Sequence, residues 1–297
     1  MPPDRFQRLG RSMKIAFLVL MHKNPEQAIR LIKALDSPNS LFVIHVDGRA
    51  PRGVLDQMTK HTANRGNIHF TRRYNCRWGG FGLVRATFAC VHAALRLPQG
   101  FDYGVLLSGQ DYPIKPLSFM MVFLDERRGE QFIESFRLDL KNRWSADIGV
   151  WNPLNKVTWY TIPIRGRRIH IPFRRRFPSG LHPFGGSQWW CLSRDCLDYV
   201  ARFAQENPTV LRYFRRVFIP DESLFHTIIS NSSFAPHVVS DDLHYTDWAR
   251  PNPAVPRTLD LSDFERLRAS NKLFARKFDI AHDNKVLDLI DSEILNQ

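Results

Sequence analysis

The first half of the chain alternates patterns typical of buried strands with patterns typical of helices. Residues 14–21 form a nearly continuous apolar run, as expected for a strand covered on both faces, and residues 41–46 repeat it. Shorter runs at residues 68–70 and 103–107 predict a third and a fourth strand. Between them, residues 83–97 carry apolar side chains at helical spacing. This order predicts an α/β fold with a doubly wound mixed sheet flanked by helices.

The helix after the first strand has a clear start signal. Asn24 is suited to cap a helix, and Pro25 is suited to its first position. Ligands bind to doubly wound sheets outside the carboxyl ends of the strands. His22 and Asp47 directly follow predicted strands, and Asp111 closes the Ser108-Gly109-Gln110-Asp111 segment after the fourth, so the sequence places all three at such ends.

The second half begins with a change of character. Residues 141–183 contain tryptophans, repeated prolines and a basic stretch, which indicate long loops or a small inserted hairpin. Strand and helix patterns return at residues 188–192 and 194–205. Residues 222–230 then read as an apolar helix that begins with Glu222.

The composition is that of a globular protein with a large positive charge. The 297 residues are 43% hydrophobic and carry a formal net charge of +13, which favours nucleic acid, anionic lipid or phosphorylated small molecules as partners. The four cysteines form no CxxC pair, so we expect small buried or partly buried thiols. No signal peptide or membrane-spanning run is visible, and a cytoplasmic location is expected.

Transfer of a group from a nucleoside diphosphate requires charge stabilisation on the leaving diphosphate. A metal held by carboxylates or fixed Arg and Lys side chains can supply it. No Asp-x-Asp follows a predicted strand, and the side chains of Asp241 and Asp242 would point apart in an extended chain, so a metal site is disfavoured. The cationic candidates are Arg257 and the pair Arg276 and Lys277, although surface charge is the alternative interpretation.

Six short segments support a more specific hypothesis. They are Ile44-His45-Val46-Asp47, Leu107-Ser108-Gly109-Gln110-Asp111-Tyr112-Pro113-Ile114-Lys115, Gly186-Ser187-Gln188-Trp189-Trp190, Pro220-Asp221-Glu222, Tyr245-Thr246-Asp247-Trp248 and Leu273-Phe274-Ala275-Arg276-Lys277-Phe278-Asp279. In order and approximate spacing, the chain resembles the core-2/I-branching β-1,6-N-acetylglucosaminyltransferases, whose family includes the protein O-xylosyltransferases. The resemblance covers about residues 13–280.

The resemblance implies a metal-independent GT-A type glycosyltransferase that inverts the anomeric centre. The donor would be UDP-N-acetylglucosamine or UDP-xylose, and the acceptor a hydroxyl of a glycan, glycolipid or peptide. By this resemblance Glu222 is the catalytic base, although a carboxylate at a helix start is also a common capping residue. The residues matched to donor binding are His45 and Asp47 for the nucleoside, Asp111 for the sugar, and Arg257, Arg276 and Lys277 for the diphosphate. Trp78 and Trp190 would lie near the sugar or in the core.

The expected organisation is a single glycosyltransferase domain. It would comprise residues 13–280, with a nucleotide-binding half at 13–115 and an acceptor and catalytic half at 116–280. Residues 1–12 would form a tail, and residues 281–297 a C-terminal helix or tail. The animal relatives carry many disulfides and a membrane anchor, so four cysteines and no visible anchor favour a bacterial-type relative.

Two other interpretations use the positive charge. A basic nucleic-acid-binding protein is the alternative function, but no nucleic-acid motif is present and no such partner is expected. A basic stretch could instead make a peripheral contact with anionic membrane at the inner face. Its arginines are Arg165, Arg167, Arg168, Arg174, Arg175 and Arg176.

Overall fold

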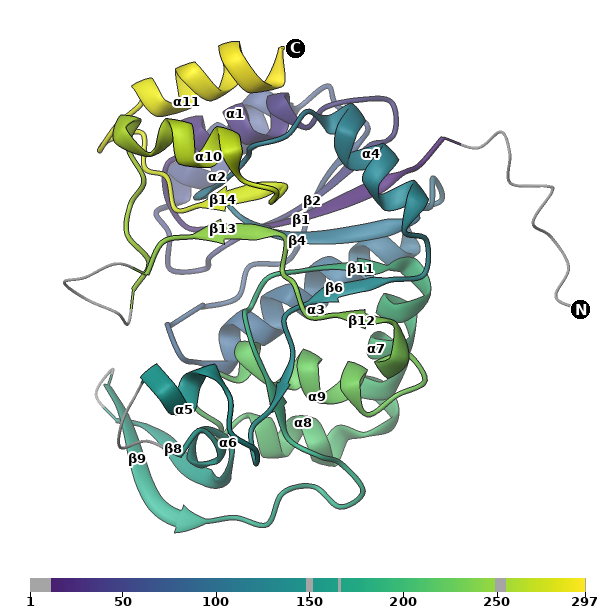
Figure 1. Cartoon of the computed structure of the whole chain (residues 1–297), viewed down its shortest axis with the longest axis vertical. Coiled ribbons are helices and arrows are strands. Elements are labelled where there is room, and N and C mark those ends of the chain that lie inside the picture. The colour runs from purple at the N-terminus through teal and green to yellow at the C-terminus, as the bar shows by residue number, and fades with distance from the viewer. Residues whose placement is uncertain (1–11, 148–151, 165–166, 249–254, 297) are drawn as a thin grey trace, which may run out of the picture.

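A mixed sheet of seven strands forms the centre of the molecule (Figure 1). The computed structural model describes residues 12–147, 152–164, 167–248 and 255–296. In spatial order the strands are β12 (Val238–Val239), β6 (Gln131–Ile133), β11 (Trp190–Ser193), β4 (Tyr103–Ser108), β1 (Ile15–Met21), β2 (Ser40–Val46) and β3 (Ile68–Phe70). The strands β4, β1, β2 and β3 are parallel, whereas β11 is antiparallel to its neighbours β4 and β6.

Helices cover both faces of this sheet. The longer ones are α1 (Pro25–Ala34), α2 (Arg52–Thr62), α3 (Phe81–Arg96), α4 (Leu117–Glu126) and α7 (Arg194–Glu206). Shorter ones are α5 (Arg143–Asp147), α6 (Leu154–Thr158), α8 (Pro208–Phe214), α9 (Leu224–Ser230), α10 (Phe264–Ala269) and α11 (Lys285–Ile290). Short 3-10 turns occur at Pro220–Glu222, Ala235–His237 and Leu261–Asp263, and a π-helical turn at Asp291–Leu295. None of the helices in the described part of the chain is long and apolar enough to cross a bilayer.

Three smaller sheets complete the structure. The strand β14 (Phe274–Arg276) lies between β13 (His244–Thr246) and β5 (Asp111–Pro113). The short strands β7 (Phe136–Arg137) and β10 (Phe184–Gly185) pair with each other. The third sheet is an antiparallel hairpin of β8 (Trp159–Ile164) and β9 (Arg167–Arg174).

Alternate side chains of β1 belong to two different hydrophobic cores, one on each face of the sheet. Ile15, Phe17, Val19 and Met21 pack with α1, α4 and α11 on one face of the sheet. The residues between them pack with α3, α7 and α9 on the other face, because successive side chains of a strand point to opposite sides. Figure 1 shows α1 and α11 on one side of the sheet, and α7, α8 and α9 on the other. Because both faces of β1 are buried, each of its positions carries an apolar residue.

The α/β architecture expected from the sequence is confirmed, with local corrections. The predicted strand at residues 68–70 coincides with β3, and the predicted helix at 194–205 with α7. As predicted, Asn24 occupies the N-cap position of α1 and Pro25 begins the helix, but the Asn24 side chain makes no capping bond and its Nδ2 donates to Asp279 Oδ1 at 2.7 Å instead. The segment containing Glu222 is also different, because a 3-10 turn comes before α9.

The inserted hairpin predicted within residues 141–183 is present as β8 and β9. Arg165 lies outside the described residues, as do residues 1–11 of the expected tail. The side chains of Arg167 and Arg168 are not described either. At the other end of the chain, α11 packs into the core around β1 through Val286, Leu287 and Ile290.

Candidate active site

The carboxyl ends of β1, β2 and β4 lie side by side at one edge of the sheet. The chain runs from β1 to β2 and β3 on one side, and β4 then returns to the opposite side of β1. This reversal of strand order creates the type of crevice in which doubly wound sheets bind ligands. His22 follows β1, Asp47 follows β2 and Asp111 follows β4, so the sequence-based placement of all three is confirmed.

Asp111 lies at the centre of a buried polar cluster. Its carboxylate is fully buried, accepts a hydrogen bond from the Ser108 N–H at 2.6 Å, and accepts another from Arg276 Nε at 3.1 Å. His244 Nε2 lies 3.6 Å from Asp111 Oδ2, while His244 Nδ1 donates to the Asp242 carbonyl at 2.7 Å. Burial alone would raise the pKa of Asp111, but Arg276, His244 and the Ser108 N–H outweigh it and lower this pKa.

Arg276 also contacts an aromatic ring. Its guanidinium carbon lies 4.5 Å from the centre of the Trp189 ring, and the same ring packs on His244 at 5.8 Å. Only 15% of the Arg276 side chain is exposed. The guanidinium is therefore fixed between Asp111 and Trp189, and β14 brings it to the end of β4 through antiparallel pairing with β5.

Lys277 follows Arg276 and has a different environment. Its side chain is half-buried, and no carboxylate among the described residues pairs with its ammonium group. Burial lowers the pKa of Lys277, and the positive charges of Arg276 and Lys23 lower it further, whereas Asp111 opposes the shift. The charge of Lys277 also contributes to a lowered pKa of His22. An excess of positive charge is thus concentrated beside the carboxyl ends of β1 and β4.

Arg257, the third predicted phosphate-binding cation, is already engaged by carboxylates. It donates to Asp247 Oδ2 at 3.0 and 3.1 Å, and it forms a close ion pair with the buried Asp263. It remains next to the cationic cluster, because the Lys277 N–H donates to the Arg257 carbonyl at 3.5 Å.

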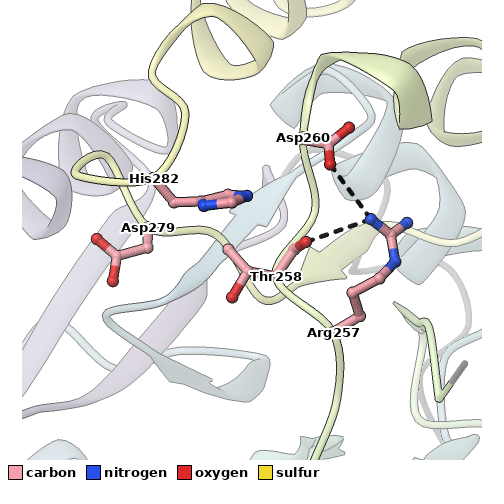
Figure 2. A pocket seen from close by; sticks show the side chains of 5 residues that line it. All are labelled: Arg257, Thr258, Asp260, Asp279 and His282. Carbon is pink, nitrogen blue, oxygen red and sulfur yellow. Dashed lines mark hydrogen bonds and ion pairs between the residues drawn. The ribbon is translucent and has the colours of Figure 1, made fainter. Parts of the chain in front are cut away.

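Arg257 also lines a surface pocket. The other residues that line this pocket are Thr258, Asp260, Asp279 and His282, and the pocket has a volume of about 530 Å³. Figure 2 shows the Arg257 guanidinium directed towards Asp260 and away from Asp279. Elsewhere, no group of three or more His, Cys, Asp or Glu side chains among the described residues is arranged to hold a metal ion.

His45 and Asp47, predicted to contact the nucleoside, organise the loop that follows β3. The Tyr74 N–H donates to His45 Nε2 at 2.9 Å, and burial lowers the pKa of His45 to about 4, so the imidazole is neutral. Asp47 Oδ1 accepts the N–H groups of Arg49 at 2.9 Å and Cys76 at 3.1 Å. Both side chains are buried, and their hydrogen bonds fix the backbone of the loops around the predicted nucleoside site.

Glu222 belongs to the second half of the chain, where it ends the Pro220–Glu222 turn and forms an ion pair with a lysine. Lys156 Nζ donates to Glu222 Oε2 at 2.9 Å and lies 3.6 Å above the centre of the Trp144 ring. The Glu222 side chain is 28% exposed, whereas the Lys156 side chain is 11% exposed. One carboxylate oxygen is therefore fixed, and Oε1 has no hydrogen-bond donor among the described residues.

The segment between β10 and β11 connects Glu222 with the cationic cluster. The Gly186 N–H donates to the Glu222 carbonyl at 3.1 Å, and three residues later Trp189 packs on Arg276. A Cβ at Gly186 would lie 1.8 Å from the Glu134 carbonyl oxygen, so a side chain cannot fit there. Glu222 and Arg276 thus border the same four-residue segment.

The two tryptophans expected near the sugar or in the core differ in their exposure to solvent. Trp190 is fully buried and belongs to the core around α9, whereas Trp78 is 64% exposed. Trp78 rests edge-on against Phe218 with ring centres 5.5 Å apart. Phe218 lies two residues before the Pro220–Glu222 turn. Of Trp78 and Trp190, it is therefore Trp78 that presents an exposed ring near Glu222.

Comparison with known proteins identifies the family. The family model described as core-2/I-branching enzyme matches residues 15–268. The chain belongs to the core-2/I-branching enzyme family. The resemblance detected from the six sequence segments is thereby confirmed.

Named members of the branching-enzyme family are similar over most of the chain. Xylosyltransferase oxt of Drosophila pseudoobscura pseudoobscura is 28% identical over 299 residues, which are 91% of this chain and 32% of that protein. Beta-glucuronosyltransferase GlcAT14A of Arabidopsis thaliana is 28% identical over 313 residues, which are 99% of this chain and 67% of that protein. The chain thus spans about a third of the length of the xylosyltransferase. A crystal structure of S. aureus TarS covers 41% of this chain with a TM-score of 0.32 and 18% identity, too distant a likeness to bear on the fold.

Several residues of the candidate site were not found by sequence reasoning. They are Lys156, His244, Glu134 and Arg143, of which Arg143 forms an ion pair with Glu134 at 2.6 Å. Glu134 in turn accepts the Ser187 N–H at 2.9 Å. The contacts of Lys156 with Glu222 and of Glu134 with Ser187 join segments distant in sequence, whereas Arg143 and Glu134 are only nine positions apart. The one available signal was the position of His244 immediately before the Tyr245 to Trp248 segment.

Replacement of Asp111 by asparagine should destabilise the protein in a pH-dependent manner. Asp111→Asn leaves the largely buried Arg276 without its carboxylate, and we expect a loss of about 3 kcal/mol at neutral pH. Because folding lowers the pKa of Asp111 below its ordinary value of 3.8, the wild-type advantage is complete above pH 3.8. The advantage disappears as the pH falls through the lowered pKa. Urea unfolding of both proteins across this range measures it, and a difference that is constant with pH would contradict the prediction.

Proposed function

We propose that this chain is an inverting glycosyltransferase of GT-A type that uses a UDP-sugar without a divalent metal. The observation that carries the proposal is the half-buried ammonium of Lys277, which has no carboxylate partner in the described part of the chain. The pKa of Lys277 is lowered by burial and by the positive charges of Arg276 and Lys23. An anion bound beside Lys277 would offset both the cost of burying its ammonium group and the repulsion from these two cations. A diphosphate at the carboxyl ends of β1 and β4 fits this requirement.

The same arrangement supports a role for fixed cations in place of a metal. Asp111, which follows a central strand, is occupied by the guanidinium of Arg276 at 3.1 Å. In the proposed mechanism, Lys277 and the partly exposed edge of Arg276 neutralise the charge that develops on the UDP leaving group. Fixed charges in a largely buried site stabilise such charge without reorganisation at the moment of reaction.

Glu222 is proposed as the base. Its carboxylate removes the proton from the acceptor hydroxyl, whose oxygen attacks the anomeric carbon of the donor sugar. The bond from this carbon to the β-phosphate oxygen breaks, and UDP leaves with the bonding electrons. A single displacement inverts the anomeric centre. The ion pair with Lys156 supports the assignment, since it fixes one carboxylate oxygen of Glu222 and so orients the side chain.

The donor sugar is proposed to be N-acetylglucosamine or xylose, with a glycan, glycolipid or peptide hydroxyl as acceptor. The names of the two relatives support xylose and add glucuronic acid as a donor to be compared. A screen for slow hydrolysis of UDP-xylose, UDP-N-acetylglucosamine and UDP-glucuronic acid distinguishes these donors, because hydrolysis needs no acceptor. The preferred sugar should be released fastest.

Titration of the protein with UDP in the presence of EDTA tests the proposed function. We expect micromolar UDP binding that chelation leaves unchanged, because the diphosphate is held by side-chain cations. Calorimetry measures the affinity with and without Mg²⁺. Loss of UDP binding in EDTA would overturn metal independence, and binding of a random oligonucleotide in preference to UDP would favour a nucleic-acid-binding protein.

A further inference from the structure

The β8–β9 hairpin presents an apolar face to solvent. On β9, Ile169, Ile171 and Phe173 are 44%, 39% and 67% exposed. Ile169 and Ile171 occupy alternate positions of β9, so their side chains lie on one face of the hairpin. The pairing of β8 with β9 is irregular between Ile171 and Arg174, and Phe173 is exposed within this irregular stretch. Tyr160, paired with Ile171 across the hairpin, is 36% exposed on this face. A contiguous exposed apolar patch of this kind marks an interaction surface more often than isolated apolar residues do.

The opposite face of the hairpin is fixed to the body of the protein. Thr161 is fully buried, and its N–H donates to the Arg216 carbonyl at 2.8 Å. The ring of His170 packs edge-on against Phe218 with centres 4.5 Å apart. Since this inner face is held by hydrogen bonds and packing, the hairpin cannot turn over to bury Ile169, Ile171 and Phe173.

Exposed arginines follow the apolar residues of β9 along the chain. Arg174 and Arg176 are exposed, and no carboxylate among the described residues pairs with either of them. Arg175 between them is different: its guanidinium lies 3.9 Å from the centre of the Tyr213 ring and donates to the Tyr213 carbonyl at 3.0 Å. Arg175 therefore anchors the hairpin, while Arg174 and Arg176 remain available to an anionic partner.

We propose that the exposed surface of the hairpin, comprising Tyr160, Ile169, Ile171, Phe173, Arg174 and the adjacent Arg176, docks on an anionic lipid bilayer. Its apolar side chains would enter the boundary between headgroups and acyl chains, and its arginines would contact lipid phosphates. A lipid surface fits better than nucleic acid because two of the three large apolar side chains exposed on β9 are isoleucines. Nucleic-acid bases stack on aromatic rings, whereas branched aliphatic side chains favour hydrocarbon.

The position of the hairpin suits this role. The helix α6, which directly precedes β8, carries the Lys156 that pairs with Glu222. Figure 1 shows the hairpin projecting from the end of the molecule opposite α1 and α11. An acceptor at the bilayer surface would thus meet the half of the protein that contains Glu222. The docking proposal does not depend on the reaction, since lipid binding requires no turnover.

Co-sedimentation of the full chain with vesicles tests the proposal. With vesicles of phosphatidylcholine and phosphatidylglycerol at low salt, we expect binding that weakens steeply as salt rises. The variant Phe173→Ser should bind about tenfold more weakly, because partial burial of this ring is lost. The double variant Arg174→Glu, Arg176→Glu should bind weaker still at low salt, since each basic residue near an anionic surface contributes several-fold in affinity.

Two matched variants control for general surface effects. Val122→Ser removes an exposed apolar residue of α4, and Lys60→Glu reverses an exposed charge of α2. Neither should change vesicle binding, and far-UV circular dichroism verifies that each variant is folded. Absence of binding to anionic vesicles, or binding that the hairpin variants leave unchanged, would overturn the proposal. Oligonucleotide binding that Arg174→Glu, Arg176→Glu abolishes while Phe173→Ser leaves it intact would also overturn it.

Discussion

Glu222→Gln should lose sugar transfer by about 10²- to 10⁴-fold while it retains UDP affinity, because a positioned base typically contributes this factor. The amide preserves the size of the side chain, so its distance to Lys156 Nζ, 2.9 Å in the wild type, can be largely maintained. The substitution removes the ability to take a proton and also the negative charge that pairs with Lys156, so thermal unfolding of the variant is measured as well. Turnover with saturating donor, measured beside a UDP titration, separates loss of chemistry from loss of binding.

A surface glutamate provides the control for this experiment. Glu265 on α10 is exposed, and Glu265→Gln should leave both turnover and UDP affinity unchanged. If Glu222→Gln turned over at the wild-type rate, the base would have to be another residue. If Glu222→Gln lost UDP affinity as well, the side chain would act in binding or folding.

The second large effect is expected at the cationic cluster. Lys277→Met keeps an apolar stem of similar length but removes the charge, and UDP should bind about 10- to 100-fold more weakly. The physical reason is that Lys277 has no carboxylate partner in the described part of the chain, so its full charge is available to the diphosphate. Calorimetric titration with UDP and with uridine measures the effect, and uridine affinity should change little.

Two variants separate charge from general disruption. Lys277→Arg retains the positive charge and should recover most of the UDP affinity. Lys285→Met removes an exposed lysine at the start of α11 and should have no effect. Equal UDP affinity in Lys277→Met and the wild type would place the diphosphate elsewhere.

The parts of the fold that could be predicted are those specified by local patterns. The strand β1 is apolar at each position because it is buried on both faces, and this can be read without knowledge of its neighbours. The helix α2 was not predicted. Most of its residues are exposed, only Met58 and Thr62 are buried, and a mostly polar segment carries little periodic signal.

The contacts of the candidate site could be predicted only in part. Asp111 and Lys277 were identified through a resemblance, and the structure adds that Arg276 binds Asp111 whereas Lys277 remains without a carboxylate in the described chain. The ion pair of Lys156 with Glu222 joins residues 66 positions apart. No local pattern encodes such a pair, because its partners meet only after the hairpin and the Pro220–Glu222 turn have packed together.

The pairing of β14 with β5 has a consequence for biosynthesis. Asp111 and Arg276 are 165 positions apart, and β14 follows every strand of the central sheet along the chain. A ribosome that has completed the seven strands of the central sheet has therefore not yet synthesised Arg276 and Lys277, the two cations proposed to bind the diphosphate. Nascent chains stalled before residue 276 would remain unable to capture nucleotide, however well their sheet had formed.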